Sequence, residues 1–254
     1  YGTLQSYWLS VAINGTPGGF ANSDNGVDNY LYAVSNISDN KWHHLAFSNQ
    51  DGADGMNIYV DGMLEKTATK SGTGVSASTT PLAIGRMDPD CNRNDTVSFR
   101  GSIDEVKIYN RTLTVAEVQA EYQMMSYGST EKDASGTPAP DVPIALWHFD
   151  DNVSNTRVED FFGGNNATLS NATFTVGVFG TNGLSFNGIN ATVIGPAVQS
   201  LNLSSNLTII LWTNSLDGND TNAYLVSKYS TGVLPSFGIS RNLSHVICTI
   251  ANST

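Results

Sequence analysis

Short runs of β-branched and aromatic residues recur along the chain, and polar turn residues separate them. In the run that begins at Met56, the side chains of Met56, Ile58 and Val60 share one strand face. Asp61 and Gly62 follow as a turn pair that tolerates positive φ, so this run is expected to open a hairpin. Because the apolar period is that of a strand, the sequence predicts an all-β antiparallel sandwich rather than βαβ units.

The predicted strands form two groups on either side of a proline-rich segment. Strands of the first group are expected at 7–13, 29–34, 43–48, 56–60, 81–86 and 102–109. Strands of the second group are expected at 144–149, 184–186, 191–194, 207–213, 224–228 and 236–240. The segment between the groups holds three of the eight prolines and almost no large aliphatic side chain, which indicates a linker. The predicted boundaries are therefore 1–125, 126–143 and 144–254.

One short helix is predicted at 112–122, near the end of the first group. Thr114 and Glu117 have the spacing of a capping box. Leu113, Val118 and Tyr122 are spaced so that they can dock on a sheet.

Composition limits the possible partners. Hydrophobic residues make up 40% of the 254 residues, which is ample for a core. Twelve Lys and Arg stand against 23 Asp and Glu, and the net charge of -11 argues against binding to a phosphate backbone. The longest apolar runs fall far short of the roughly 20 residues that span a bilayer. The chain is therefore expected to bind no nucleic acid and to contain no transmembrane segment, and no signal peptide is recognised before Tyr1.

Asparagine is unusually often placed in glycosylation sequons. The 26 Asn and 51 Ser and Thr would give about five Asn-x-Ser/Thr sequons by chance, a composition estimate. The chain has thirteen, which indicates a secreted chain with a glycan-covered surface, although clustering of polar turn residues in β-rich proteins is an alternative. The acceptors are Asn14, Asn36, Asn94, Asn110, Asn152, Asn166, Asn171, Asn190, Asn202, Asn206, Asn219, Asn242 and Asn252.

Cysteine leaves two interpretations open. Cys91 and Cys248 are the two cysteines, and they can form one disulfide in an oxidising compartment or remain as two buried thiols. Their spacing does not suggest a zinc or redox motif.

Two sets of ordered motifs point to a known family. The first set is Lys41-Trp-His-His-Leu-Ala46, Ile58-Tyr-Val-Asp-Gly62, Leu82-Ala-Ile-Gly85 and Arg100-Gly-Ser-Ile-Asp-Glu-Val-Lys-Ile-Tyr-Asn-Arg-Thr-Leu-Thr114. It resembles the C-terminal half of laminin G-like jelly-roll domains of the concanavalin A-like lectin/glucanase superfamily. The second set resembles the N-terminal half of such a domain: Ala145-Leu-Trp-His-Phe-Asp150, Val158-Glu-Asp160, Gly183-Leu-Ser-Phe-Asn-Gly188 and Leu207-Thr-Ile-Ile-Leu-Trp212. The resemblance covers nearly the whole chain except the linker, and it implies a jelly-roll sandwich.

The two halves stand in reverse order along the chain. The strand at 236–240 also looks like the strand at 6–10, an offset of about 230 residues, so the chain is interpreted as one register of a tandem repeat cut mid-domain. A half sandwich leaves strand edges open, so the halves are expected to complete each other. Pairing with a neighbouring copy is favoured, because repeats join through nearest-neighbour contacts. Pairing within the chain is the alternative, and the linker allows it.

Catalysis is not expected. Glucanases of the superfamily carry a Glu-x-Asp-x-Glu strand that supplies two carboxylates on one face, and this chain has no such run. Asp104 and Glu105 are adjacent, so in a regular strand their side chains would point to opposite faces. His43, His44 and His148 lie within predicted strands and are interpreted as structural.

A calcium site is the most plausible cofactor site. Members of the superfamily often hold Ca²⁺ with carboxylates and carbonyls, as a hard cation prefers. Asp104 is expected to be partly buried and to need a partner, either backbone N–H groups or an ion, and the backbone is the leading alternative. Asp150 and Asp160 are the further candidate ligands.

The predicted function follows from these features. The chain is expected to be a non-enzymatic extracellular or cell-surface glycoprotein repeat with a structural or adhesive role, whose partners are copies of itself. The alternative is a carbohydrate-binding, lectin-like module of a larger secreted protein with glycans as partners. The four tryptophans are expected in the core, whereas Tyr30, Tyr32 and Tyr229 are better candidates for exposed sugar contacts.

Overall fold

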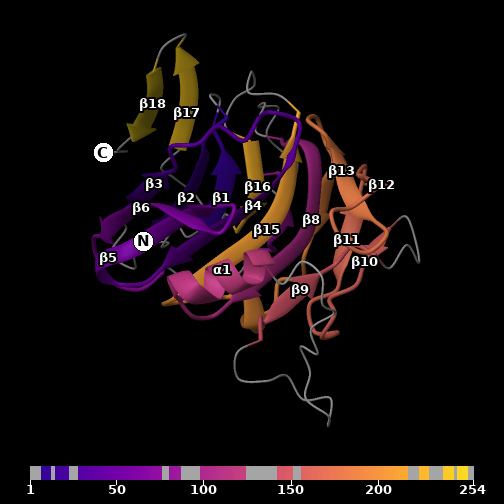
Figure 1. The fold of residues 1–254 in the computed structure, drawn as a ribbon, viewed down its shortest axis with the longest axis horizontal. Coiled ribbons are helices and arrows are strands. Elements are labelled where there is room, and N and C mark those ends of the chain that lie inside the picture. The colour runs from indigo at the N-terminus through magenta and orange to yellow at the C-terminus, as the bar shows by residue number, and fades with distance from the viewer. Residues whose placement is uncertain are drawn as a thin grey trace.

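The computed structural model describes residues 7–12, 15–22, 28–75, 80–86, 98–123, 142–150, 156–216, 223–228, 237–242 and 245–250. Two antiparallel eight-stranded sheets pack face to face as a sandwich (Figure 1). Sheet A has the order β10 (Arg157–Val158), β11 (Ala167–Ser170), β14 (Thr192–Ile194), β7 (Ala83–Ile84), β16 (Ala223–Ser227), β1 (Tyr7–Val11), β2 (Pro17–Asn22) and β3 (Asp28–Tyr32).

Sheet B has the order β12 (Thr173–Thr175), β13 (Gly183–Asn187), β8 (Arg100–Tyr109), β15 (Leu207–Ser215), β4 (Trp42–Asn49), β5 (Gly52–Val60) and β6 (Met63–Lys70), and β9 (Ala145–Trp147) pairs with β8. Helix α1 (Val115–Gln123) lies on this sheet (Figure 1), and η1 (Gln199–Leu201) is a single 3-10 turn. A separate hairpin joins β17 (Phe237–Asn242) to β18 (His245–Ile250). The predicted all-β antiparallel sandwich with one short helix is confirmed.

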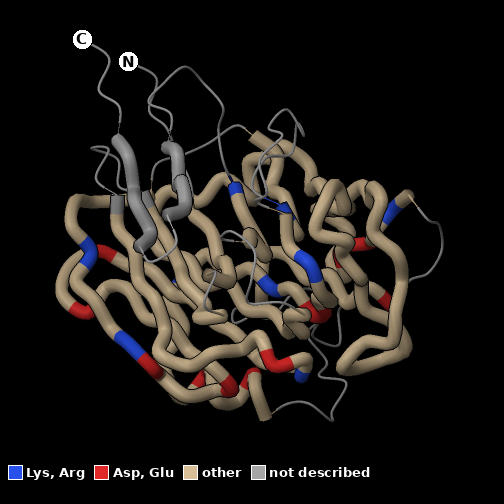
Figure 2. Tube along the Cα trace, turned by 90° about the horizontal axis from the view of Figure 1, so that it is seen from above, with Lys and Arg blue, Asp and Glu red and all other residues tan. Residues whose placement is uncertain are grey.

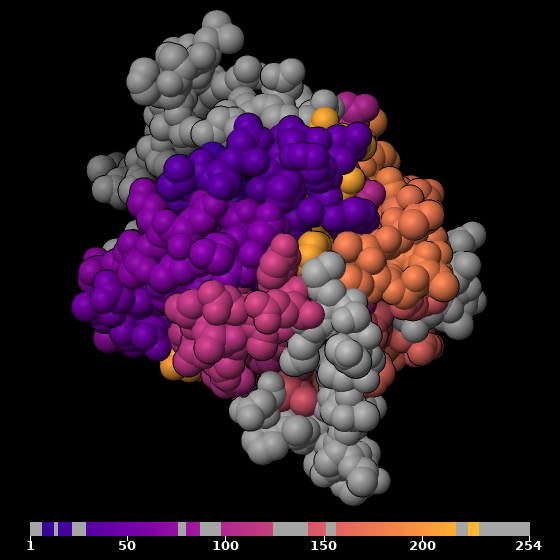
Figure 3. All heavy atoms as spheres, viewed as in Figure 1, coloured from indigo at the N-terminus to yellow at the C-terminus, as the bar shows by residue number. Residues whose placement is uncertain are grey.

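Strands from the two predicted halves alternate within both sheets. In sheet B, β15 of the second half lies between β8 and β4 of the first half. In sheet A, β7 of the first half lies between β14 and β16 of the second, and β16 also pairs with β1. Figure 3 shows that early and late residues form one continuous surface. Within this chain the halves therefore build one sandwich together, and pairing between copies remains a prediction.

The main core lies between the two sheets and is filled from both. Its members include Leu9 of β1, Leu45 of β4, Leu211 of β15 and Trp147 of β9, all essentially inaccessible to solvent. The indole N–H of Trp147 donates to the backbone carbonyl of Asn165 at 3.0 Å, so its one polar atom is satisfied inside the core.

The predicted local structure is confirmed at several positions. Asp61 (φ 49°) and Gly62 (φ 75°) form the turn between β5 and β6. At the start of α1 the backbone N–H of Thr114 donates to the Glu117 carboxylate at 2.7 Å, and the N–H of Glu117 donates to the Thr114 hydroxyl at 3.3 Å. Leu113 belongs to the small apolar cluster between α1 and sheet B.

Several strands were not predicted. β2 begins with Pro-Gly-Gly, and the edge strand β6 reads Met-Leu-Glu-Lys-Thr-Ala-Thr-Lys, which has no alternation of apolar and polar residues. Most of the predicted linker, residues 126–141, lies outside the described residues, so the boundaries at 125 and 143 remain predictions. None of the described helices has the length and hydropathy needed to span a membrane. Figure 2 shows Lys and Arg scattered among Asp and Glu along the described trace.

Candidate functional site

A row of three side chains crosses the outer face of sheet B. His44 of β4 lies opposite Trp212 of β15, and Trp212 lies opposite Asp104 of β8. The chain neighbours Leu45 and Leu211 belong to the main core, so His44 and Trp212 face away from it. This outer face brings together His44, Trp212 and Asp104, three residues that the sequence analysis discusses, and it is the candidate functional site.

His44 is buried by aromatic rings. The Trp212 ring lies 5.3 Å from the His44 ring in an edge-on arrangement, and Tyr122 of α1 stacks on Trp212 at 5.7 Å. Neither His44 ring nitrogen has a hydrogen-bond partner among the described residues. Burial lowers the pKa of His44 to about 3, and the nearby Lys107 charge acts in the same direction. His44 is therefore neutral, which fits the structural role predicted for it.

Asp104 is buried against the backbone of a neighbouring loop. Its carboxylate accepts the N–H groups of Val178 at 2.8 Å, Phe179 at 3.3 Å and Glu105 at 2.9 Å. A Cβ on Gly177 would lie 2.5 Å from an Asp104 oxygen, so glycine permits this approach. Burial raises the pKa of Asp104 to about 8, reinforced by the Glu105 charge. The backbone thus supplies the hydrogen-bond partners that the sequence left as the alternative to an ion.

A β-bulge at Glu105 breaks the strand alternation that the sequence predicted for Asp104 and Glu105. Glu105 has φ 52°, and the β8–β15 register shifts between Ile210 and Trp212. The expectation that the two carboxylates point to opposite faces assumed a regular strand, and the bulge corrects that premise. The Glu105 carboxylate pairs with His148 Nδ1 at 2.8 Å.

The three predicted metal ligands each have their own hydrogen-bond donors. Asp150 accepts the N–H groups of Thr181 at 2.7 Å and Asn182 at 2.8 Å. Asp160 is almost fully buried and accepts several N–H groups, including those of Leu146 and Asn165, both at 2.9 Å. Within the described ranges no group of three or more His, Cys, Asp or Glu could hold a metal ion. The calcium site remains a prediction.

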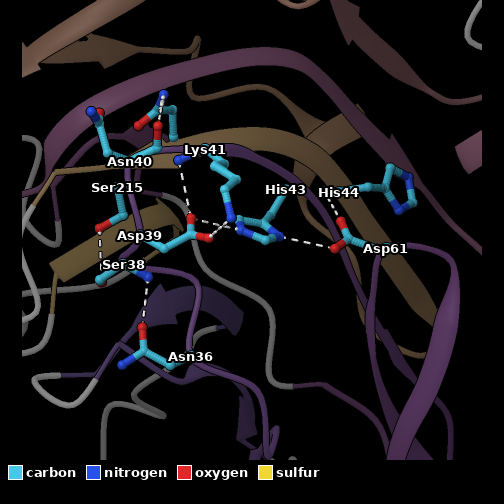
Figure 4. A network of polar contacts seen from close by, with 10 residues as sticks. Asn36, Ser38, Asp39, Asn40, Lys41, His43, His44, Asp61 and Ser215 are labelled. Atoms are coloured by element: carbon cyan, nitrogen blue, oxygen red, sulfur yellow. Dashed lines mark hydrogen bonds and ion pairs between the residues drawn. The ribbon is translucent and has the colours of Figure 1, made fainter.

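His43, near the start of β4, is held between two carboxylates (Figure 4), and strand alternation points it to the side opposite His44. Its Nδ1 lies 2.9 Å from Asp61, in the turn after β5, and its Nε2 lies 3.0 Å from Asp39, in the loop before β4. Partial burial lowers the pKa of His43, but the bonds to Asp61 and Asp39 outweigh it and the pKa is raised. The bonds to Lys41 and His43 lower the pKa of Asp39 to about 2. His43 therefore ties the loop before β4 to the β5–β6 turn.

Every glycosylation acceptor with a described side chain lies outside the strands. Asn36, Asn110, Asn171, Asn190 and Asn206 are exposed, and Asn166 and Asn202 are half-buried. Asn242 lies in β17, and Asn14, Asn94, Asn152, Asn219 and Asn252 lie outside the described residues, as does Cys91. Glycosylation and the Cys91–Cys248 disulfide remain predictions.

The outer face of sheet A carries an aromatic cluster that the sequence did not predict. Trp8 stacks on Phe20 at 5.3 Å and meets Tyr224 edge-on at 5.2 Å, and the half-buried Tyr30 packs beside them. Because Tyr7 faces the core, alternation places Trp8 on the opposite side, so strand parity is the signal that could have found this cluster. The expectation that all tryptophans lie in the core holds for Trp147, whereas Trp8 and Trp212 are buried on outer faces and Trp42 is half-buried.

Comparison with known proteins supports the fold family for the first part of the chain. Residues 2–119 match the laminin G family profile described as the concanavalin A-like lectin/glucanases superfamily. This range contains β1–β8, so the superfamily predicted from the motifs is confirmed for these residues. Comparison with curated proteins and with solved structures gave no match.

Proposed function

We propose that this chain, whose residues 2–119 match the concanavalin A-like lectin/glucanase superfamily, is a non-enzymatic structural or adhesive unit of an extracellular glycoprotein. The observation that carries the proposal is the interlocking of the two halves. Strand β15 belongs to the second half of the chain, and both strands that pair with it, β4 and β8, belong to the first half. Neither half closes a sandwich without the other, so in an array of repeats each half would need a complementary half, which within this chain is supplied by the chain itself.

The candidate site fits a supporting role rather than a reactive one. His44 is neutral and packed between rings, and His43 is engaged by two aspartates. Asp104 is engaged by backbone N–H groups, and His148 by Glu105. Exposed sequon asparagines outside the strands would carry glycans on an extracellular surface without disturbing the sandwich.

Two measurements on the secreted chain test this role. Intact mass before and after enzymatic glycan release should fall from a value well above 27.1 kDa towards that of the bare chain. Light scattering over a wide range of concentrations should show self-association of the glycosylated chain. A secreted chain of bare mass that stays monomeric would contradict the proposal.

Carbohydrate binding is the second candidate, and the aromatic cluster on sheet A favours it. Tyr30 is the half-buried member of that cluster and could offer a ring face to a sugar, whereas Tyr122, half-buried on the outer face of sheet B, is the matched control. On a glycan array, Tyr30→Ala should abolish a signal that Tyr122→Ala retains. An equal response to both substitutions would reject this candidate.

A further inference from the structure

One hairpin stands apart from the sandwich. β17 and β18 pair only with each other among the described strands, and Figure 1 shows them beyond the edge of the two sheets. The sequence of this hairpin can be compared with that of β1, at the other end of the chain.

The segment that leads into β17 repeats the sequence of the segment that leads into β1. The pattern Gly-x-Leu-x-Ser, then an aromatic residue, any residue, an aliphatic residue and Ser, occurs at 2–10 and again at 232–240. The tripeptide Ala-Asn-Ser occurs at 21–23 and again at 251–253. Both correspondences have an offset of 230 residues. The first covers the beginning of β1 and of β17, whereas residues 11–20 and 241–250 share no residue at this offset, so the repeat is carried by β1 and β17.

Both segments open an antiparallel hairpin, but the two hairpins differ in register. In the first hairpin Tyr7 lies opposite Ala21, and in the second Phe237, the counterpart of Tyr7, lies opposite Ile250. Ala251 is the counterpart of Ala21, so the two registers differ by one residue. The matching sequence therefore identifies β17 as a second copy of β1, independently of its partner strand.

The first copy fills a defined slot in sheet A. β1 pairs with β16 on one side and with β2 on the other, and β2 pairs with β3. Tyr7 and Leu9 of β1 point into the main core from this slot. The second copy has Phe237 and Ile239 at the corresponding positions, so it carries the apolar pattern that the slot requires.

The second copy also has the direction and the reach to enter that slot. Nine residues, 228–236, separate the end of β16 from the start of β17. A connection of this length allows an antiparallel return beside β16, which is the direction that β1 has there.

The aromatic cluster explains why β1 holds the slot in this chain. Trp8 and Phe20 of the first copy pack with Tyr30 and Tyr224 on the outer face of sheet A. At the position of Trp8 the second copy has Gly238, so it would lose this stacking.

We propose that β17–β18 is the first hairpin of a following copy of the same unit. We propose further that consecutive copies join along the side of β16 that pairs with β1 in this structure. At this junction β17 pairs with β16 in the place that β1 occupies here. This inference rests on the proposed repeat array and names the surface through which its units are linked.

Disulfide trapping in the full chain tests the junction. In a background of Cys91→Ser and Cys248→Ser, the pair Ala223→Cys and Arg241→Cys reports β17 beside β16. The matched pair Ala223→Cys and Val11→Cys reports β1 in the same place, because Val11 lies opposite Ala223 and aligns with Arg241. Each pair is then combined with W8G and G238W, which exchange the aromatic anchor between the copies.

Exchanging the aromatic anchor should change which strand occupies the slot beside β16, from β1 to β17. The A223C/R241C crosslink within one chain should rise at least about tenfold, and the A223C/V11C crosslink should fall, because a buried Trp contributes several times the free energy of a tenfold ratio. G238W alone should also raise the A223C/R241C crosslink. This variant leaves β1 intact, so it serves as the control in case W8G unfolds the chain.

Absence of the A223C/R241C crosslink in every background, with the A223C/V11C crosslink intact, would overturn the junction. A crosslink that joins two chains would also overturn it, since nine residues connect β16 to β17 within one chain. Glycan mass and light scattering do not depend on this trap, so its failure is distinguishable from failure of the proposed function.

Discussion

The Asp160 side chain is the clearest place to test how the second half of the chain is held in the sandwich. It is 3% exposed and accepts N–H groups from β9 and from the loop that follows β10. The N–H of Leu146 and the N–H of Asn165 reach it in buried positions, both at 2.9 Å. The donors at Phe162 and Gly164 are longer, at 3.4 and 3.2 Å, and lie nearer to solvent.

Asp160→Ala should destabilise the chain by about 4 kcal/mol. The substitution leaves two well-buried backbone N–H groups without an acceptor, and each such group costs about 1–3 kcal/mol. Water can satisfy the two outer donors. The side-chain amide of Asn165, which also donates to Asp160, keeps its bond to the Ile144 carbonyl at 2.9 Å, so these groups add little.

Urea unfolding followed by tryptophan fluorescence measures this loss. Glu159→Gln is the matched control, because that side chain is 44% exposed and such changes usually stay within about 0.5 kcal/mol. A loss below about 1 kcal/mol for Asp160→Ala would refute this reasoning.

Two further predictions concern pH. The raised pKa of His43 means that its bonds to Asp39 and Asp61 stabilise the fold below the unfolded-state pKa, and that this contribution is lost as pH rises through the folded-state pKa. His43→Gln should flatten that part of the stability profile, and an unchanged slope would contradict the clamp. Burial raises the pKa of Asp104 to about 8, so its contribution is complete below the unfolded pKa and is lost as pH rises through about 8. Carboxyl NMR should show an Asp104 midpoint near 8, absent in Asp104→Asn, and a midpoint near 4 would show that the backbone N–H bonds outweigh burial.

The sequence by itself determined the features that depend on neighbours along the chain. Alternation in the run from Met56 to Val60 gave a strand, and the turn residues Asp61 and Gly62 gave a hairpin. The capping pair Thr114 and Glu117 gave the start of the helix. These signals are readable because strand period, turn conformation and helix capping are set by contacts within a few residues.

Only the tertiary structure decided which strands meet and what their outer faces do. The placement of β15 between β8 and β4 joins segments about a hundred residues or more apart, and no local pattern encodes that choice. The bulge at Glu105 removes the basis for the inference that Asp104 and Glu105 point to opposite faces. The bulge is a feature of the pairing between β8 and β15, so the sequence of β8 alone does not reveal it. Trp8 and Asp104 find their partners across strands and loops, so their burial on outer faces follows from packing between distant segments and not from their own sequence context.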